Sequence, residues 1–358
     1  MSTGMGSEFA ASEQAADRAG AEMADAHADI GEHPATVGAR LHQALHSRAT
    51  LGSFMVLLLA GIFFSFWAPH FLAANTFSLI IQQTMVVGTV AIAQAIVVLT
   101  AGIDLSVGSI LVLTMMLMAK LASTYDMPGF VVLLIGLSIG ALCGFINGFL
   151  ITRLKLPPFI VTLGTLSIFF SLNLYISEGQ TVNAQDMTPL LVWTGKSFKF
   201  LGTNFTYGSV MVLVLFLVFS FVLANSAWGR HIYATGDDVE AARLAGIQTN
   251  RVLLSAYTLA GLICAVGAWM LIGRIGAASP QSGQTLNLDS ITAVVVGGIS
   301  LFGGRGKLIG VLFGTLIVGF FETGLKLGGV DVLWQRFAVG ALVVAAVAID
   351  QWIRKVQS

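Results

Sequence analysis

Three carboxylates stand in or beside strongly apolar stretches of this sequence, where a charge needs a physical reason. Asp104 and Asp289 lie at the start of such stretches, and Glu322 lies within one. A carboxylate inside a bilayer is costly, so it usually faces a cavity or finds a partner. Asp104 and Asp289 therefore cap or brace a helix, line or gate a pathway, or carry a proton. For Glu322 the structural alternative is an ion pair with Lys326, one helical turn later.

Neutral polar side chains recur within the apolar stretches and could serve the same pathway. The candidates are Ser106, Asn147, Thr165 and Asn173. Amides and hydroxyls both donate and accept hydrogen bonds, as a pathway for a hydroxyl-rich solute such as a sugar requires. Hydrogen bonding between neighbouring helices is the structural alternative for each of them.

One polar segment, WGRHIYATGDDVEAARLAGIQTNRV at 228–252, separates two apolar stretches. Its residues 240–245 are expected to form a short helix. Asp237 or Asp238 can cap the N-terminus of that helix, and Gly246 can end it in a left-handed conformation. A short helix of small residues at a membrane surface could fill a groove on a partner protein. A capped connector between two spans is the alternative.

The composition is that of an integral membrane protein. Charged residues make up 10% of the chain, against about 25% in a typical soluble protein. Hydrophobic residues make up 56%, and the mean hydropathy is +0.86. Because about 20 apolar residues cross a bilayer as a helix, we expect an all-α membrane protein with about ten transmembrane helices, or fewer if span three or span eight is re-entrant. The expected spans are 51–69, 77–100, 106–123, 130–152, 159–177, 208–224, 251–273, 288–302, 308–325 and 333–352.

Residues 1–48 are polar, rich in alanine and acidic, and they predict a disordered tail ahead of a transmembrane domain at 49–358. With this tail in the cytoplasm, most Lys and Arg residues of the predicted loops also fall inside, as the positive-inside rule requires. Both termini are then expected to be cytoplasmic.

A weak internal repeat is visible. The stretch GIDLSVGSILV at 102–112 and the stretch LNLDSITAVVV at 286–296 each open a span with an Asp and then a hydroxylated residue. They are five spans apart, an odd number, so the second copy would be inverted in the membrane. The sequence thus suggests two inverted five-helix repeats, an arrangement common in transporters.

Several other kinds of site are not expected. Cys143 and Cys264 both lie in apolar stretches, and the histidines are scattered, so neither a disulfide, a metal site nor a catalytic cluster is indicated. No basic run suggests a nucleic-acid partner. The turn GGRGKL at 303–308 lacks the first glycine and the Ser/Thr of a phosphate-binding loop, so we expect no nucleotide or other cofactor on this chain.

The polar segment also carries a resemblance. The pattern EAA-x-x-x-G at Glu240, Ala241, Ala242 and Gly246 resembles the coupling loop of ABC importer permeases. Three further stretches look like the ribose/galactose/xylose-type permease family: GIDLSVGS at 102–109, NGFLITRLKLPPFIVTLGTLSI at 147–168 and GGISLFGGRGKLIG at 297–310. The similarity runs over almost all of the chain beyond the tail, with Ala101 standing where that family often has glycine.

The resemblance implies a non-catalytic subunit of a monosaccharide importer in a bacterial inner membrane. Residues 228–250 would be the coupling loop, seated in a separate cytoplasmic subunit that binds ATP and Mg²⁺. A periplasmic sugar-binding protein would deliver the substrate, and two permease copies among membrane lipid would form the pore. The coupling residues would be Gly236, Asp237, Glu240, Ala241, Ala242, Arg243 and Gly246.

Two other functions compete with this one. A secondary transporter driven by an ion gradient would use Asp104 or Glu322 and would need no loop of this kind. A permease for branched-chain amino acids is related in pattern. The sequence does not say which sugar would be carried.

Overall fold

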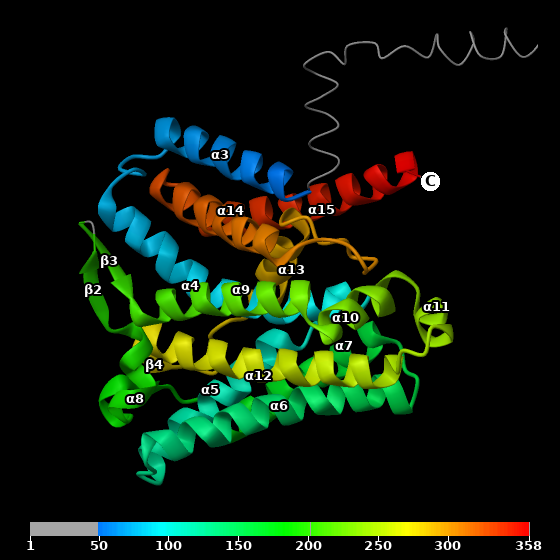
Figure 1. The fold of residues 1–358 in the computed structure, drawn as a ribbon. Coiled ribbons are helices and arrows are strands. Elements are labelled where there is room, and N and C mark those ends of the chain that lie inside the picture. Colours follow the sequence, from blue (N-terminus) through cyan, green and yellow to red (C-terminus); the bar gives the residue numbers. More distant parts are fainter. Residues whose placement is uncertain (1–48, 201, 358) are drawn as a thin grey trace, which may run out of the picture. The chain divides into compact units, whose positions relative to one another are not determined.

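The computed structural model describes residues 49–200 and 202–357, most of which are helical (Figure 1). The expected tail at 1–48 lies outside the described residues. The longer helices are α3 (Ala49–Trp67), α4 (Ala74–Leu99), α5 (Val107–Thr124), α6 (Gly129–Arg153), α7 (Pro158–Ser177), α9 (Tyr207–Asn225), α10 (Ala227–Asp237), α12 (Thr249–Ile275), α13 (Leu286–Val296), α14 (Leu308–Leu327) and α15 (Val332–Gln357). The shorter elements are α8 (Pro189–Val192), α11 (Val239–Leu244), 3₁₀ turns at Ala184–Asp186 and Trp193–Gly195, and strands β1 (Val182–Asn183), β2 (Ser197–Phe200), β3 (Thr203–Thr206) and β4 (Ala277–Ala278).

Eight helices of the described chain are long and apolar enough to cross a membrane: α3, α4, α5, α6, α7, α9, α12 and α14. Their most apolar windows have mean hydropathies between 1.7 and 2.5. They coincide with eight of the predicted spans. The protein is therefore a multi-pass membrane protein, as expected.

The predicted span at 288–302 is only partly helical. Helix α13 has 11 residues, about half of what a bilayer crossing needs. It ends where Gly297 and Gly298 follow it, and Gly298 has a positive φ of 86°. A turn then leads to α14. The last predicted span, 333–352, lies within α15.

Helices α4 and α12 form the centre of the transmembrane body. Residues 84–99 of α4 are buried without a break, which fits a helix that is apolar on every side. Helix α4 packs against α12, α13 and α14, and α12 packs against α4, α5 and α6. By contrast, α3 buries little of its apolar surface and leaves the rest for lipid.

The packing repeats. Helix α4 packs against α13 and α14, and α12 packs against α5 and α6 in the corresponding way. Likewise, α15 packs against α13 as α7 packs against α5. Each element lies five predicted spans away from its counterpart. The arrangement agrees with the pair of five-helix repeats suggested by the sequence.

Glycines allow α6 and α12 to approach until their backbones touch. A Cβ placed on Gly144 would lie 2.1 Å from the carbonyl oxygen of Tyr257, and one on Gly261 would lie 2.1 Å from the carbonyl oxygen of Gly140. Any side chain at Gly144 or Gly261 would separate the two helices. This pair therefore follows the small-residue packing common in membranes.

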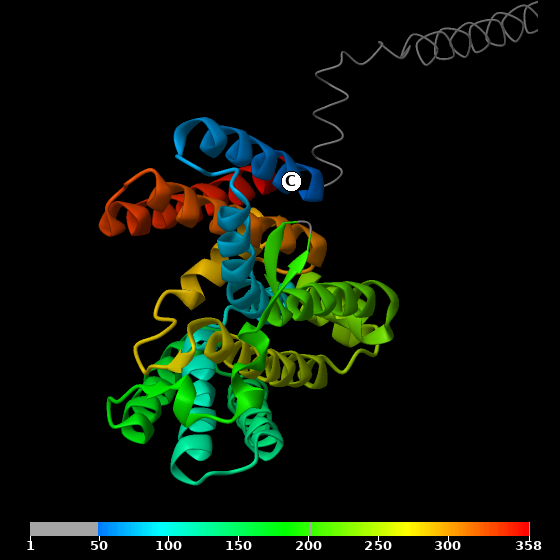
Figure 2. The same cartoon turned by 90° about the vertical axis from the view of Figure 1, so that its left-hand side faces the viewer.

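Residues 178–206, between α7 and α9, carry strands β1, β2 and β3. Strands β2 and β3 form an antiparallel hairpin, and β1 pairs with β4. The Ser78 hydroxyl of α4 donates to the carbonyl oxygen of Asn204 at 2.7 Å, which ties the hairpin to the bundle. The hairpin lies at one end of the bundle and α11 at the other (Figure 1). We call these the hairpin end, which faces the viewer in Figure 2, and the α11 end.

Candidate functional site

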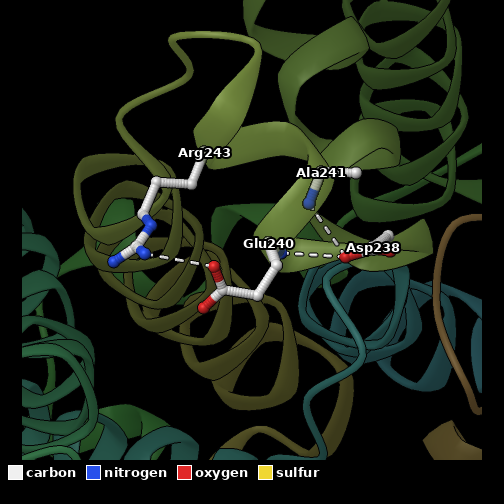
Figure 3. Close-up of polar contacts among 4 residues, drawn as sticks. All are labelled: Asp238, Glu240, Ala241 and Arg243. Atoms are coloured by element: carbon white, nitrogen blue, oxygen red, sulfur yellow. Dashed lines mark hydrogen bonds and ion pairs between the residues drawn. The ribbon is translucent and has the colours of Figure 1, made fainter.

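The short surface helix is present and capped as the sequence predicted. It covers Val239–Leu244, one residue earlier than the expected 240–245. Asp238 is the N-cap, since its Oδ1 accepts hydrogen bonds from the backbone N–H groups of Glu240 at 2.9 Å and Ala241 at 3.0 Å (Figure 3). Of the two candidates, Asp238 rather than Asp237 holds this position.

The end of α11 is equally well defined. Gly246 has a φ of +85°, the left-handed conformation expected after a helix. Its N–H donates to the carbonyl of Arg243, and the Ile247 N–H donates to that of Ala242, both at 3.0 Å. These bonds satisfy carbonyls that the helix end leaves open. The segment is thus a closed, ordered element.

The outer face of α11 is exposed and mixed in character. Leu244 has 84% of its surface exposed, while Ala242 is buried and anchors the helix. Glu240 and Arg243 form an ion pair of 3.2 Å on the surface (Figure 3). Such an exposed pair contributes little to stability. Leu244 is thus an exposed apolar side chain beside an exposed ion pair.

Helix α10 fixes this face to the core through backbone contacts. A Cβ on Gly236 would lie 1.8 Å from the carbonyl oxygen of Leu99, at the end of α4. A Cβ on Gly304 would lie 2.7 Å from the Cα of Asp237. The Gly304 N–H also donates to the carbonyl of Leu99 at 3.0 Å. Three chain segments meet here without intervening side chains, and the sequence alone did not indicate this role for Gly236.

Side chains of α10 add two further attachments. The Tyr233 hydroxyl donates to the carbonyl of Gly306 at 2.9 Å, and burial raises the pKa of Tyr233, so the hydroxyl keeps its proton. The indole N–H of Trp228 donates to Ser255 Oγ on α12 at 2.8 Å. These bonds hold α10 to the turn between α13 and α14 and to the first part of α12.

Three of the predicted polar residues meet in the membrane region. Asp104, in the segment between α4 and α5, accepts hydrogen bonds at Oδ1 from the Ser106 backbone N–H at 2.8 Å and from the Ser106 hydroxyl at 2.6 Å. Asn147 of α6 donates to Ser106 Oγ at 2.8 Å. All three are buried. Asp104 therefore braces the entry to α5 and, through Ser106, links it to α6.

The same cluster includes a residue that the sequence did not single out. A Cβ on Gly102 would lie 2.5 Å from the hydroxyl oxygen of Tyr257, so α12 closes the cluster from a third side. Within the described chain, Asp104 Oδ2, Asn147 Oδ1 and the Tyr257 hydroxyl have no hydrogen-bond partner. Tyr257 looked like one more residue of an apolar span, which is why sequence reasoning missed it.

Thr165 and Asn173 of α7 are not part of this cluster. The Thr165 hydroxyl donates to the carbonyl of Thr162 in its own helix at 3.4 Å. Asn173 Nδ2 donates to the carbonyl of Pro280 at 3.1 Å, in the segment that precedes α13. Both side chains are buried. Asn173 thus links the two repeats, whereas Thr165 bonds only locally.

Glu322 has a different partner from the one predicted. Its Oε2 accepts a hydrogen bond from Gln83 Nε2 of α4 at 2.5 Å, and Gln83 Oε1 accepts one from Arg274 of α12. In the described residues Glu322 makes no ion pair with Lys326, so that interpretation was wrong. The reason is that α14 packs against α4 here, and this places the carboxylate against the polar edge of its neighbour.

Asp289 is bonded within its own helix. Its Oδ2 accepts a hydrogen bond from the Thr285 hydroxyl at 2.9 Å. Thr285 rather than Asp289 is the N-cap residue of α13, and Asp289 lies in the first turn. A carboxylate there interacts favourably with the helix dipole. In the part of the chain that the structure describes, no three His, Cys, Asp or Glu side chains are grouped to hold a metal ion.

Comparison with known proteins is consistent with these features. Residues 76–347 match the family model described as "Branched-chain amino acid transport system / permease component". The chain is 48% identical over 341 residues to the fructose import permease protein FrcC of Rhizobium meliloti, covering 93% of this chain and 95% of that protein. No solved structure is significantly similar to it.

Two further relatives are named for other sugars. The ribose import permease protein RbsC of Bacillus subtilis is 36% identical over 305 residues, which cover 84% of this chain and 92% of RbsC. The D-allose transport system permease protein AlsC of Escherichia coli is 34% identical over 313 residues, or 85% of this chain and 92% of AlsC. Each alignment extends over nearly the whole relative.

Proposed function

The chain belongs to the branched-chain amino acid transport system / permease component family, and from this membership we propose that it forms the membrane pore of an ATP-driven monosaccharide importer. One observation carries the proposal. The capped and exposed helix α11 is held against the core by α10, so it can receive a push from outside and pass it on.

The partner at α11 is a cytoplasmic ATP-binding subunit. Helix α11 seats in a groove of that subunit, with Leu244 as its apolar contact and Glu240 and Arg243 as its polar rim. ATP and Mg²⁺ are bound by the partner, and this chain carries no cofactor of its own. Asp237 and Gly236, at the end of α10, form the rigid base of the coupling loop.

Movement of α11 reaches the pore through two connected sets of contacts. The first is the backbone junction of Gly236, Leu99 and Gly304. The second is the cluster of Asp104 and Ser106, which begins five residues after Leu99 and reaches Asn147 of α6. A shift of α10 would therefore move the α4–α5 segment and, with it, α6. We assign Asp104, Ser106 and Asn147 to the transmission of this movement toward the gate on these grounds.

The substrate is a monosaccharide, because the similar permeases are named for fructose, ribose and allose. Fructose is the first sugar to test, given the 48% identity to a fructose permease. Thr165, Asn173, Asp289 and Glu322 remain candidates for the pathway, since sugar hydroxyls bind amide, hydroxyl and carboxylate groups. The family description keeps a branched-chain amino acid as the second substrate class.

The assembly follows from the same assignment. The α11 end faces the cytoplasm together with both chain termini, and the hairpin end faces the periplasm of a bacterial inner membrane. A sugar-binding protein docks at the hairpin end and delivers its ligand. Two copies of this chain, surrounded by membrane lipid, form the pore between them.

The test is uptake into proteoliposomes that contain the permease, its ATP-binding subunit and the binding protein, with ion gradients collapsed. Radiolabelled fructose, ribose, allose and leucine are supplied in turn. We expect uptake of one sugar that requires ATP and both partners. Uptake of leucine alone would favour the amino-acid alternative. Uptake that ignores ATP and needs an ion gradient would show a secondary transporter and refute the proposal.

A further inference from the structure

A basic pocket lies at the α11 end, between the end of α6, the end of α11 and the start of α12. It has a volume of about 400 Å³ and is lined by Arg153, Arg243 and Arg251. In the described residues the one ion pair at this pocket joins Arg243 to Glu240, and Arg153 and Arg251 have no carboxylate partner. The side chains of three arginines around one opening can bind an anion with several oxygens.

An apolar groove adjoins this pocket. It has a volume of about 350 Å³ and runs between α6 and α12. Arg251 and Leu254 line both cavities. From Arg251 to Leu262 the groove follows one face of α12 over roughly 16 Å of helix, and Ala141 and Phe145 of α6 form its other wall.

The groove offers little to a polar ligand. Its two hydroxyls donate hydrogen bonds within their own helix. Ser255 donates to the carbonyl of Val252 and Thr258 to that of Leu254, both at 2.7 Å. Apart from Arg251 at one end, the remaining lining is alkyl or aromatic, and Phe145 is 41% exposed. Because the groove lies on two membrane-spanning helices, an apolar chain is the ligand that fits it.

A charged pocket joined to an apolar groove calls for an amphipathic ligand with an anionic head. We propose that this is a binding site for one anionic glycerophospholipid. Its phosphate lies among Arg153, Arg243 and Arg251, and one acyl chain lies in the groove between α6 and α12. Basic pockets between transmembrane helices on the cytoplasmic side bind anionic head groups in this way.

The site would make transport depend on lipid composition. Arg243 belongs to α11 and is already paired with Glu240. A phosphate in the pocket competes with Glu240 for that guanidinium and ties the end of α11 to α6 and α12. A permease in a bilayer without anionic lipid would therefore hold α11 less firmly.

The experiment uses native mass spectrometry of the purified full-length permease in complex with its ATP-binding subunit. Phosphatidylglycerol and phosphatidylcholine are titrated separately as the probes. We expect one tightly bound phosphatidylglycerol per permease copy. The double variant R153Q/R251Q should bind it roughly 25-fold more weakly, because two basic contacts are lost. The matched control is Arg230→Gln, an exposed arginine of α10 that lines neither cavity.

A second variant separates lipid from other anions. Ala141→Phe fills the groove and leaves the arginines in place, so it should also weaken phosphatidylglycerol binding, whereas binding of inorganic phosphate should not change. Equal binding of both lipids, or wild-type binding in both variants, would overturn the proposal. Loss of ATP-binding subunit from R153Q/R251Q in pure phosphatidylcholine, with Ala141→Phe unaffected, would show an acidic protein segment in the pocket and would equally overturn it.

Discussion

The two ends of the bundle are held together in different ways. At the α11 end, the contacts join backbones and short buried side chains, as in the Gly236–Leu99 junction and the Asp104–Ser106 pair. At the hairpin end, long side chains that are half-buried reach across three helices, from Glu322 through Gln83 to Arg274. The first kind of contact allows almost no movement without a clash. The second can break and form again by rotation of side chains.

This difference suits the two ends to different roles in transport. A signal from α11 needs a stiff path, because slack between α10 and α4 would absorb the movement. A gate needs contacts that can break and form again, and the Glu322–Gln83–Arg274 link can do so by rotation of its side chains. We therefore interpret the α11 end as the transmitting part of the molecule and the Glu322–Gln83–Arg274 link as the part that yields.

The largest effect is expected from Gly236→Val. The added Cβ would lie 1.8 Å from the Leu99 carbonyl oxygen, so α10 must move away from α4. Sugar uptake should fall to background while the protein still inserts and binds its ATP-binding subunit. The control is Gly52→Val in α3, where no atom lies within 4 Å of an added Cβ. Equal uptake by both variants would show that the junction is not rigid.

Asp104→Ala should have the next largest effect, on stability as well as uptake. It removes the acceptor of the Ser106 N–H and hydroxyl, and each buried donor left unpaired costs about 1–3 kcal/mol. Thermal unfolding in lipid nanodiscs measures the loss. Asp104→Asn retains an oxygen that can accept the N–H, so it should lose less stability. If Asp104→Ala unfolds at the same temperature as the wild type, Asp104 does not brace the α4–α5 segment.

Breaking the hairpin-end link should cost less. Glu322→Gln removes the charge facing Gln83 and, beyond it, Arg274, which are half-buried. We expect stability to fall by about 1 kcal/mol or less. A double-mutant cycle with Arg274→Gln, read by thermal unfolding, isolates the coupling between the two charges. A coupling as large as the Asp104→Ala loss would contradict the idea that this link yields easily.

The smallest effect is expected from Asp289→Asn. The Thr285 hydroxyl can still donate to the remaining side-chain oxygen, so stability should change by about 0.5 kcal/mol or less. Uptake rates at saturating sugar provide a second readout. A strong loss of uptake with unchanged stability would instead place Asp289 on the sugar pathway and weaken the contrast with Asp104.

Local features were predictable from the sequence. Runs of about 20 apolar residues specify a membrane helix by themselves, and eight such runs are helices of that length. The surface helix was also predictable, because a capping Asp238 and a left-handed Gly246 act within a few residues. Span 288–302 was overestimated, because its apolar residues continue past the glycines that end α13.

Contacts between distant segments were decided by the tertiary structure alone. Asn147 and Ser106 are 41 residues apart, and Glu322 and Gln83 are 239 apart. No spacing rule relates such positions, so the sequence could name the polar residues but could not pair them. It determined which segments are helices in a membrane and which loop is a capped surface helix. Packing of those helices then decided that Asp104 meets Asn147, that Glu322 turns to Gln83, and that α10 rests on the end of α4.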